Sequence, residues 1–262
     1  MKAHFNDPVD SADWNSIEAK TADLEKLIRR IAQDDAPAAF ASSFGAEDML
    51  LTDLIVGTGA PIEIFSIDTG RLPQETYALI ANTRARYGAE IKIYFPRFDL
   101  VEAYVHEHGI NAFYDSVDLR KTCCRIRKIE PLRRALSGKK AWITGLRAEQ
   151  SAARSEFRIE EYDKDNGLKK FNPLLDWSEK EVWAYLRKKR VPYNALHDRF
   201  YPSIGCAPCT RSVAAGEDAR SGRWWWENST NRECGLHVRR LEPGDRAELL
   251  PSPKDSRAKT SL

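Results

Sequence analysis

Five cysteines and their spacing constrain this 262-residue chain more than any other feature of its sequence. Cys123 and Cys124 are adjacent, Cys206 and Cys209 form a Cys-x-x-Cys pair, and Cys234 stands alone near the C-terminus. Two pairs and one single cysteine suggest four ligands for a metal centre and one thiol left for chemistry.

The expected compartment decides how these cysteines are interpreted. The first residues of the chain are polar and acidic, without the apolar core of a secretory signal. No stretch approaches the roughly 18 apolar residues of a membrane helix. We therefore expect a cytoplasmic protein without membrane association. Thiols stay reduced there, so cysteine pairs bind metals or catalyse more often than they form disulfides.

The spacing leaves the identity of the metal open. A Cys-x-x-Cys pair is a common half of a structural zinc site, but adjacent cysteines suit zinc poorly. An iron–sulfur cluster spreads its iron atoms over a larger cage and can accept neighbouring thiolates on different irons. The pattern therefore favours a cluster, with zinc and a metal-free chain as alternatives.

Strand and helix signals alternate through the first half of the chain. The expected strands are Ala38–Ser43, Ile62–Ile67, Ile91–Phe95 and Ala141–Thr144. The expected helices are 16–33, 46–56, one opened by Pro73 and running to Tyr87, 100–108 capped by Asp99, and 124–137. This alternation predicts an α/β fold with a Rossmann-like parallel sheet. Ligands of such sheets bind at the carboxyl ends of the strands.

Polar loops with glycines follow three of these strands. Glycine permits tight turns and close approach of a ligand, free amides at a helix N-terminus attract anions, and arginine suits phosphate. Taken alone, the first two loops fit an ordinary helix start and a strand-to-loop turn better, whereas the place of the third loop after a strand favours ligand binding. The candidate nucleotide-binding residues are Ser42, Ser43, Gly45, Glu47 and Asp48; then Asp68, Thr69 and Gly70; and then Gly145, Arg147 and Arg154.

Three further segments complete a family pattern: Arg120–Lys128, Tyr201–Arg211 and Glu233–His237. With the loops, they resemble the assimilatory adenylyl-sulfate (APS) reductases, the thioredoxin-dependent, iron–sulfur type of the APS/PAPS reductase family. The resemblance covers roughly residues 36–237. It implies an adenine-nucleotide α-hydrolase (ATP-pyrophosphatase-like) fold and strand-end loops that bind the nucleotide. It also implies a [4Fe-4S] cluster held by the four paired cysteines, Cys123, Cys124, Cys206 and Cys209.

Four basic side chains are candidates for holding an anionic substrate. Lys128 follows Cys124 by four residues, so in a regular helix the two share a face, although most lysines are simply exposed. The resemblance implies that Lys128 links cluster and substrate electrostatically. It further implies that Arg220 and Arg223, with His237, bind the phosphosulfate. The triple tryptophan after Arg223 is expected to be packed rather than exposed.

Cys234 is the candidate nucleophile. A free cysteine is often a buried structural residue, but no apolar run surrounds this one, and Arg232 and His237 could lower its pKa. The expected mechanism is attack of Cys234 on the sulfur of APS, loss of AMP, and release of sulfite from the S-sulfonate by thioredoxin. The polar segment after Cys234 is expected to form a mobile flap.

The expected organisation has four parts. They are an N-terminal helical segment (1–35), a nucleotide-binding α/β domain (36–200), a cluster-ligand and catalytic-cysteine segment (201–240) and a disordered tail (241–262). We also expect a homo-oligomer.

Three other functions share parts of this pattern. A PAPS or dual-specificity reductase would share the loops, and an ATP-pyrophosphatase-like thiolation enzyme would share the fold. A zinc module binding nucleic acid is disfavoured by a formal net charge of only +2.

Overall fold

The computed structural model describes residues 14–150 and 156–227. Three of the candidate site residues, Arg154, Cys234 and His237, lie outside these ranges. So do the expected C-terminal flap and the tail, residues 241–262.

A six-stranded sheet with the strand order β3-β2-β1-β4-β6-β5 forms the centre of the fold. The strands are β1 (Ala38–Ala41), β2 (Glu63–Ile67), β3 (Ile91–Tyr94), β4 (Ala141–Ile143), β5 (Glu160–Asp163) and β6 (Leu168–Phe171). The pairs of β1 with β2 and β4, of β2 with β3, and of β4 with β6 are parallel. The predicted Rossmann-like parallel sheet is confirmed. Two strands beyond the four expected ones extend it: the parallel strand β6 and the antiparallel edge strand β5.

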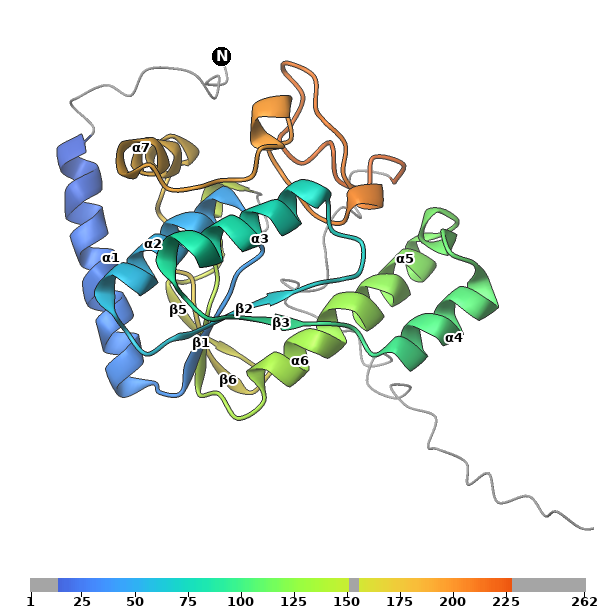
Figure 1. Cartoon of the computed structure of the whole chain (residues 1–262), viewed down its shortest axis with the longest axis horizontal. Helices are drawn as coiled ribbons and strands as arrows, with labels where there is room; N and C mark the ends of the chain where they lie inside the picture. The colour runs from blue at the N-terminus through green and yellow to red at the C-terminus, as the bar shows by residue number, and fades with distance from the viewer. Residues whose placement is uncertain (1–13, 151–155, 228–262) are drawn as a thin grey trace, which may run out of the picture.

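Helices cover both faces of this sheet (Figure 1). The helices α1 (Trp14–Asp34), α2 (Ala46–Thr58), α3 (Gln74–Tyr87) and α7 (Glu179–Lys189) share the larger apolar core with one face of the sheet. On the other face, α6 (Glu130–Leu136) packs on Phe65 and Trp142, and α4 (Phe98–His108) and α5 (Val117–Cys124) lie beside it. Both faces of the parallel strands are therefore buried, as such strands require.

Several helix boundaries differ from the expected ones. Pro73 is the N-cap of α3 rather than its first residue. Helix α4 begins at Phe98 and is preceded by Arg97, so Asp99 lies in the first turn and pairs with Arg97 at 2.6 Å instead of capping. The expected helix 124–137 is the end of a longer run, in which α5 passes through a π-helical turn, Arg125–Ile129, into α6.

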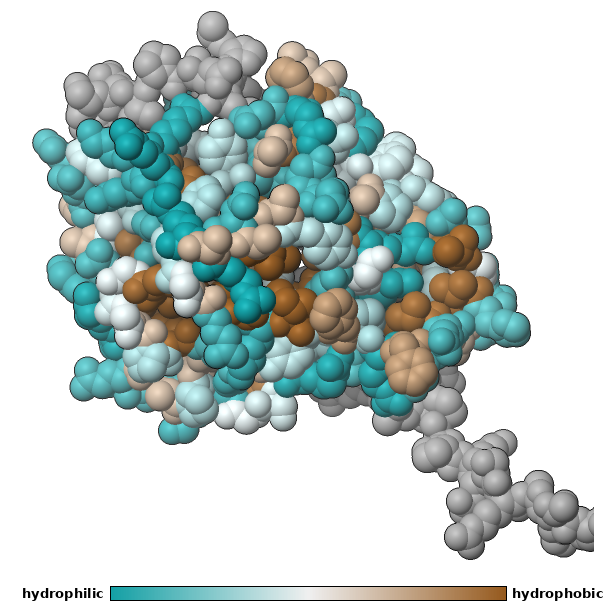
Figure 2. All heavy atoms as spheres, viewed as in Figure 1, coloured by the Kyte–Doolittle hydropathy of each residue, from teal (hydrophilic) through white to brown (hydrophobic). Residues whose placement is uncertain are grey.

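The molecular surface is predominantly hydrophilic on the face shown in Figure 2, where apolar residues form small separate groups. Among residues 14–150 and 156–227, no helix is both long and apolar enough to cross a membrane.

Asp53 on α2 joins three helices, and its removal should destabilise the fold. Its two carboxylate oxygens accept hydrogen bonds of 2.7 Å from Tyr87 of α3 and Tyr185 of α7. Asp53→Ala should lower the free energy of unfolding in urea by about 2–3 kcal/mol, because two tyrosine hydroxyls lose a charged acceptor. Asp23→Ala is the control: it breaks an exposed pair with Lys26 and should cost less than about 1 kcal/mol. Equal losses in both variants would contradict this role.

Candidate functional site

The loop between β1 and α2 is a tight turn held by a buried carboxylate. Asp48, in the first turn of α2, accepts bonds of 2.6 Å from both the backbone nitrogen and the hydroxyl of Ser43. The turn passes through Phe44 at φ +61° and reaches Gly45, the N-cap of α2. Buried Ser42 extends the strand by donating its N–H to the Phe65 carbonyl at 2.8 Å. Helix α2 therefore begins at the carboxyl edge of the sheet, and the backbone amides of a helix N-terminus favour an anion.

Gly145, at the end of β4, lies directly against this turn. A Cβ on Gly145 would lie 2.2 Å from Oδ1 of Asp48 and 3.1 Å from Cβ of Glu47, so only glycine fits without displacement. Arg147 donates to Glu47 at 2.7 Å and to Glu149 at 2.7 Å, and its side chain is buried. The β1 and β4 loops are thus joined by an ion pair at the position where the sequence predicts a nucleotide.

Asp68, Thr69 and Gly70 form the third loop, after β2. The Asp68 carboxylate accepts from the Gly70 backbone at 2.7 Å and from the Tyr77 hydroxyl at 2.9 Å, while Gly70 has φ +70°. The hydroxyl of Thr69 lies 3.2 Å from the Cys206 sulfur. A hydrogen bond within the loop therefore stabilises its turn, and the loop directly contacts the second cysteine pair.

The segment that carries Cys206 and Cys209 packs onto this loop. The backbone nitrogen of Ala207 donates to the Arg71 carbonyl at 2.8 Å. Within the segment, the Thr210 hydroxyl donates to the Cys206 carbonyl at 2.9 Å and accepts from Gly205. In Figure 1 this segment, in orange, lies above α3 beside the loop that follows β2.

Cys123 and Cys124 approach the same place from the end of α5. Burial raises the pKa of Cys123, opposed by Arg127, and the neighbouring Cys206 raises it further. Burial raises the pKa of Cys209 to about 12, with further increases from Cys206 and Cys123. Three of the four paired cysteines therefore interact electrostatically, and Cys124 is half-buried beside Cys123.

The donor set at this place consists of four cysteine thiols, none of them in a disulfide. Thiolate ligands suit both zinc and iron–sulfur clusters. In residues 14–150 and 156–227, no three Cys, His, Asp or Glu side chains are grouped closely enough to hold one metal ion. A four-iron cage spans a larger space than one ion and takes one thiolate per iron. Binding would deprotonate the thiols, against the raised pKa values of Cys123 and Cys209.

Two of the expected cationic residues, Lys128 and Arg223, lie near Cys209. Lys128, half-buried in the π-helical turn, lowers the pKa of Cys209, as does Arg223. Arg223 is buried, with Nε 3.4 Å from the Cys209 carbonyl, and the backbone N–H of Arg223 donates to the Arg220 carbonyl at 2.9 Å. Lys128 therefore faces the cysteines from a π turn rather than through the regular i, i+4 spacing expected.

The triple tryptophan is only partly packed. Trp224 is buried, and Trp226 packs edge-on against Tyr114, with ring centroids 4.5 Å apart. Trp225 remains 37% exposed, contrary to the expectation for the whole run. Trp225 contacts the rings of Trp226 and of Tyr114, and Tyr114 is itself exposed.

Three buried or ring-stacked arginines near the cysteines were not predicted from the sequence. Arg127 donates to the Thr69 carbonyl at 2.7 Å, Arg71 stacks on Phe113 and bonds the Ile110 carbonyl, and Arg120 is 1% exposed. Arg120 and Arg127 lie in a segment rich in Lys and Arg, where most such side chains are solvated. The one available signal was their spacing of three and four residues from Cys123.

Asp48 should make stability depend on pH. Burial raises its pKa from 3.8 to about 6, although the Ser43 hydrogen bonds act in the opposite direction. The folded state then binds the Asp48 proton more tightly than the unfolded state, so this contribution to stability is lost as the pH rises from about 4 to about 6. Asp48→Asn should remove that part of the slope in urea unfolding measured across this range. Asp99→Asn is the control, because Arg97 lowers the pKa of that carboxyl, and it should leave the slope in this pH range unchanged. An unchanged slope in Asp48→Asn would refute the assignment to Asp48.

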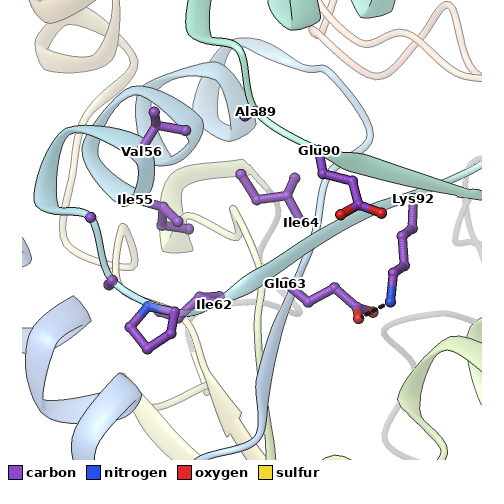
Figure 3. Close-up of a pocket in the computed structure, with 11 residues that line it drawn as sticks. Ile55, Val56, Ile62, Glu63, Ile64, Ala89, Glu90 and Lys92 are labelled. Carbon is purple, nitrogen blue, oxygen red and sulfur yellow. Dashed lines mark hydrogen bonds and ion pairs between the residues drawn. The ribbon is translucent and has the colours of Figure 1, made fainter.

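A separate surface hollow lies away from this site. It has a volume of about 400 Å³ and is lined by the end of α2 and the beginnings of β2 and β3. Figure 3 shows Ile55, Ile62 and Ile64 on its apolar side, and Lys92 paired with Glu63 at 2.6 Å. It opens at the amino edge of the strands, whereas the loops described above lie at the carboxyl edge.

The fold is a Rossmann-like parallel sheet of the adenine-nucleotide α-hydrolase type, flanked by helices, with three polar loops at its carboxyl edge. Yeast FAD synthetase shows the same fold, with a TM-score of 0.52 at 14% identity over 79% of this chain and 71% of that one. A phosphoadenylyl-sulfate (PAPS) reductase from Candida auris matches with a TM-score of 0.62 and 27% identity, over 79% of this chain and all of that one.

The sequence comparisons identify the family. The model of the phosphoadenosine phosphosulfate reductase domain matches residues 37–212. An adenosine 5'-phosphosulfate reductase of Allochromatium vinosum is 52% identical over 89% of this chain and 91% of its own length. The chain belongs to the phosphoadenosine phosphosulfate reductase family, and the predicted resemblance is confirmed.

Proposed function

We propose that the protein reduces adenylyl sulfate to sulfite and AMP, with thioredoxin as the electron donor. One observation carries the proposal: the second cysteine pair packs directly on the β2 loop, with the Thr69 hydroxyl 3.2 Å from the Cys206 sulfur. A cysteine-bound group would therefore adjoin a nucleotide at the carboxyl edge of the sheet. The 52% identical relative named adenosine 5'-phosphosulfate reductase supports the choice of substrate.

The three strand-end loops would bind the AMP part of the substrate. Backbone amides at the start of α2 suit the α-phosphate, and Gly145 allows the nucleotide to approach the backbone. Asp68, Thr69 and Gly70 line the adjacent strand end. Arg147, paired with Glu47, is positioned to exchange that partner for phosphate, and we assign Arg154 to the same loop.

Lys128, Arg220, Arg223 and His237 would hold the phosphosulfate. Lys128 and Arg223 already act on the electrostatics of Cys209. A dianionic ligand beside the cysteines needs this positive charge, since anionic thiolates would otherwise repel it.

Cys234 would carry the reaction. Its thiolate attacks the sulfur of the substrate, an S–S bond forms, and the bond between sulfur and the phosphate oxygen breaks so that AMP leaves with the electron pair. A thioredoxin thiolate then attacks the Cys234 sulfur and releases sulfite as a mixed disulfide forms. The second thioredoxin thiol resolves that disulfide, so the dithiol supplies both electrons.

Cys123, Cys124, Cys206 and Cys209 would hold a [4Fe-4S] cluster. When bound, this group would supply iron–thiolate bonds that join the two cysteine segments and a net negative charge that the nearby cations balance. Sulfite production fits a role in assimilatory sulfate reduction and cysteine biosynthesis. We further propose that the enzyme acts in the cytoplasm as a homo-oligomer.

Sulfite release tests this function. Protein purified without oxygen is given reduced thioredoxin and either APS or PAPS. Release from APS, with little from PAPS, is the expected result. Equal release from both substrates would replace the APS preference with dual specificity. No sulfite from either, with iron present, would refute the reductase and favour an adenylating enzyme of the same fold.

A further inference from the structure

A buried ion pair joins the helix of the first cysteine pair to the last described residue of the chain. Arg120 on α5 donates from Nε to Oε1 of Glu227 at 2.8 Å and from a terminal nitrogen to Oε2 at 2.7 Å. The two side chains are only 1% and 4% exposed. A bidentate pair is geometrically specific, and breaking a buried pair leaves an uncompensated charge. The pair therefore fixes residue 227 against α5.

Trp224 connects this pair to Arg223. The Arg120 guanidinium lies 4.8 Å from the Trp224 ring centroid, and the Arg223 guanidinium lies 4.7 Å from it. Trp224 has φ +44°, a strained value for a residue with a side chain, which persists only where the surroundings impose it. The turn from Arg223 to Glu227 is thus held in an unfavourable conformation by contacts that include Arg120.

Arg223 in turn lies against the loop that carries Cys206 and Cys209, here called the cysteine loop. A Cβ on Gly205 would lie 2.2 Å from a terminal nitrogen of Arg223, so the guanidinium occupies the space above the Gly205 backbone. It also lies 3.3 Å from the Ser203 hydroxyl. Any shift of the turn would move this guanidinium relative to Cys206 and Cys209.

We propose that Arg120 and Glu227 are positioning residues for the reaction. They hold the strained turn, so that Arg223 stays at the cysteine loop and Glu227 stays at a fixed position. Cys234 follows Glu227 by seven residues, so it can reach at most about 25 Å from that position. A fixed attachment point raises the effective concentration of the thiol at the substrate. Only the effect of the ion pair on the rate of the reaction rests on the proposed function.

Two measurements on the full chain, purified without oxygen, test the pair. Glu227→Gln keeps the shape but removes the charge, and Glu217→Gln is the matched control, since it weakens an ion pair with Arg211 in the same segment. Amide hydrogen exchange of residues 222–227 should rise about tenfold or more in Glu227→Gln and less than about twofold in the control. The single-turnover rate of Cys234 sulfonation at saturating APS should fall about tenfold, with AMP affinity unchanged.

The double variant Arg120→Met with Glu227→Leu separates positioning from packing. It retains a buried apolar contact and should fold even if single variants do not. Rapid exchange in the turn and slow sulfonation in this variant would support positioning by the ion pair, whereas wild-type values for both would overturn it. Uniformly faster exchange throughout the sheet in Glu227→Gln would also overturn it. The hydrogen-exchange measurement needs no substrate. A wild-type chain that never releases sulfite would therefore refute the proposed function without affecting the exchange result.

Discussion

Cys234→Ser should reduce sulfite release by about 10³-fold or more, because a serine hydroxyl is a far weaker nucleophile than a thiolate and cannot form an S-sulfonate. The substitution removes one sulfur atom and leaves the four paired cysteines in place. AMP affinity and iron content should therefore match those of the wild type. This combination separates loss of the nucleophile from loss of the site.

Asn231→Ser is the control for Cys234→Ser, since it changes a neighbouring polar side chain in the same segment. It should retain sulfite release within about threefold, because it leaves the Cys234 thiol and the proposed ligands of the substrate unchanged. Substantial release from Cys234→Ser would contradict the proposed nucleophile. The search would then move to the paired thiols.

Cys206→Ser should abolish both the iron content and sulfite release, the latter by about 10²-fold or more. Cys206 is the buried member of the second pair and touches Thr69, so it lies where the cysteine segment meets the nucleotide loop. Serine can preserve a hydrogen bond to Thr69, but its hydroxyl is a poor replacement for a thiolate on iron. The visible absorbance of the protein should disappear with the iron.

Metal analysis of Cys206→Ser and the wild type also distinguishes the two metals that the cysteine spacing left open. Four irons and four sulfides in the wild type would support the cluster. Stoichiometric zinc without visible absorbance would instead establish the zinc alternative. Ser212→Ala, an exposed change three residues beyond Cys209, is the control and should keep its metal.

Much of the parallel sheet could be predicted because buried strands such as Ile62–Ile67 are short apolar runs between turn signals. The edge strand β5 could not: its sequence, Glu160-Glu161-Tyr162-Asp163, is charged and half-exposed, which suits an edge but not a strand pattern. Helix α7 was missed despite a capping box between Ser178 and Glu181, a signal that the sequence does contain.

Candidate site residues could be named from the sequence where a motif marks them, but not where only tertiary packing does. Gly145 could be named from its place after a strand. The reason that glycine is required there, close contact with Asp48, is visible only in three dimensions. Arg120 reads as one of many basic residues, and nothing in the sequence pairs it with Glu227, 107 positions away. The π turn at Arg125–Ile129 likewise follows from no local propensity that we can identify.

The most direct test of the account is the mass of the protein after exposure to APS without any reductant. The account predicts one added SO₃ group per chain, located on the peptide that contains Cys234 and released as sulfite when reduced thioredoxin is added. No adduct, or an adduct on Cys123, Cys124, Cys206 or Cys209, would contradict the central claim that Cys234 attacks the substrate sulfur.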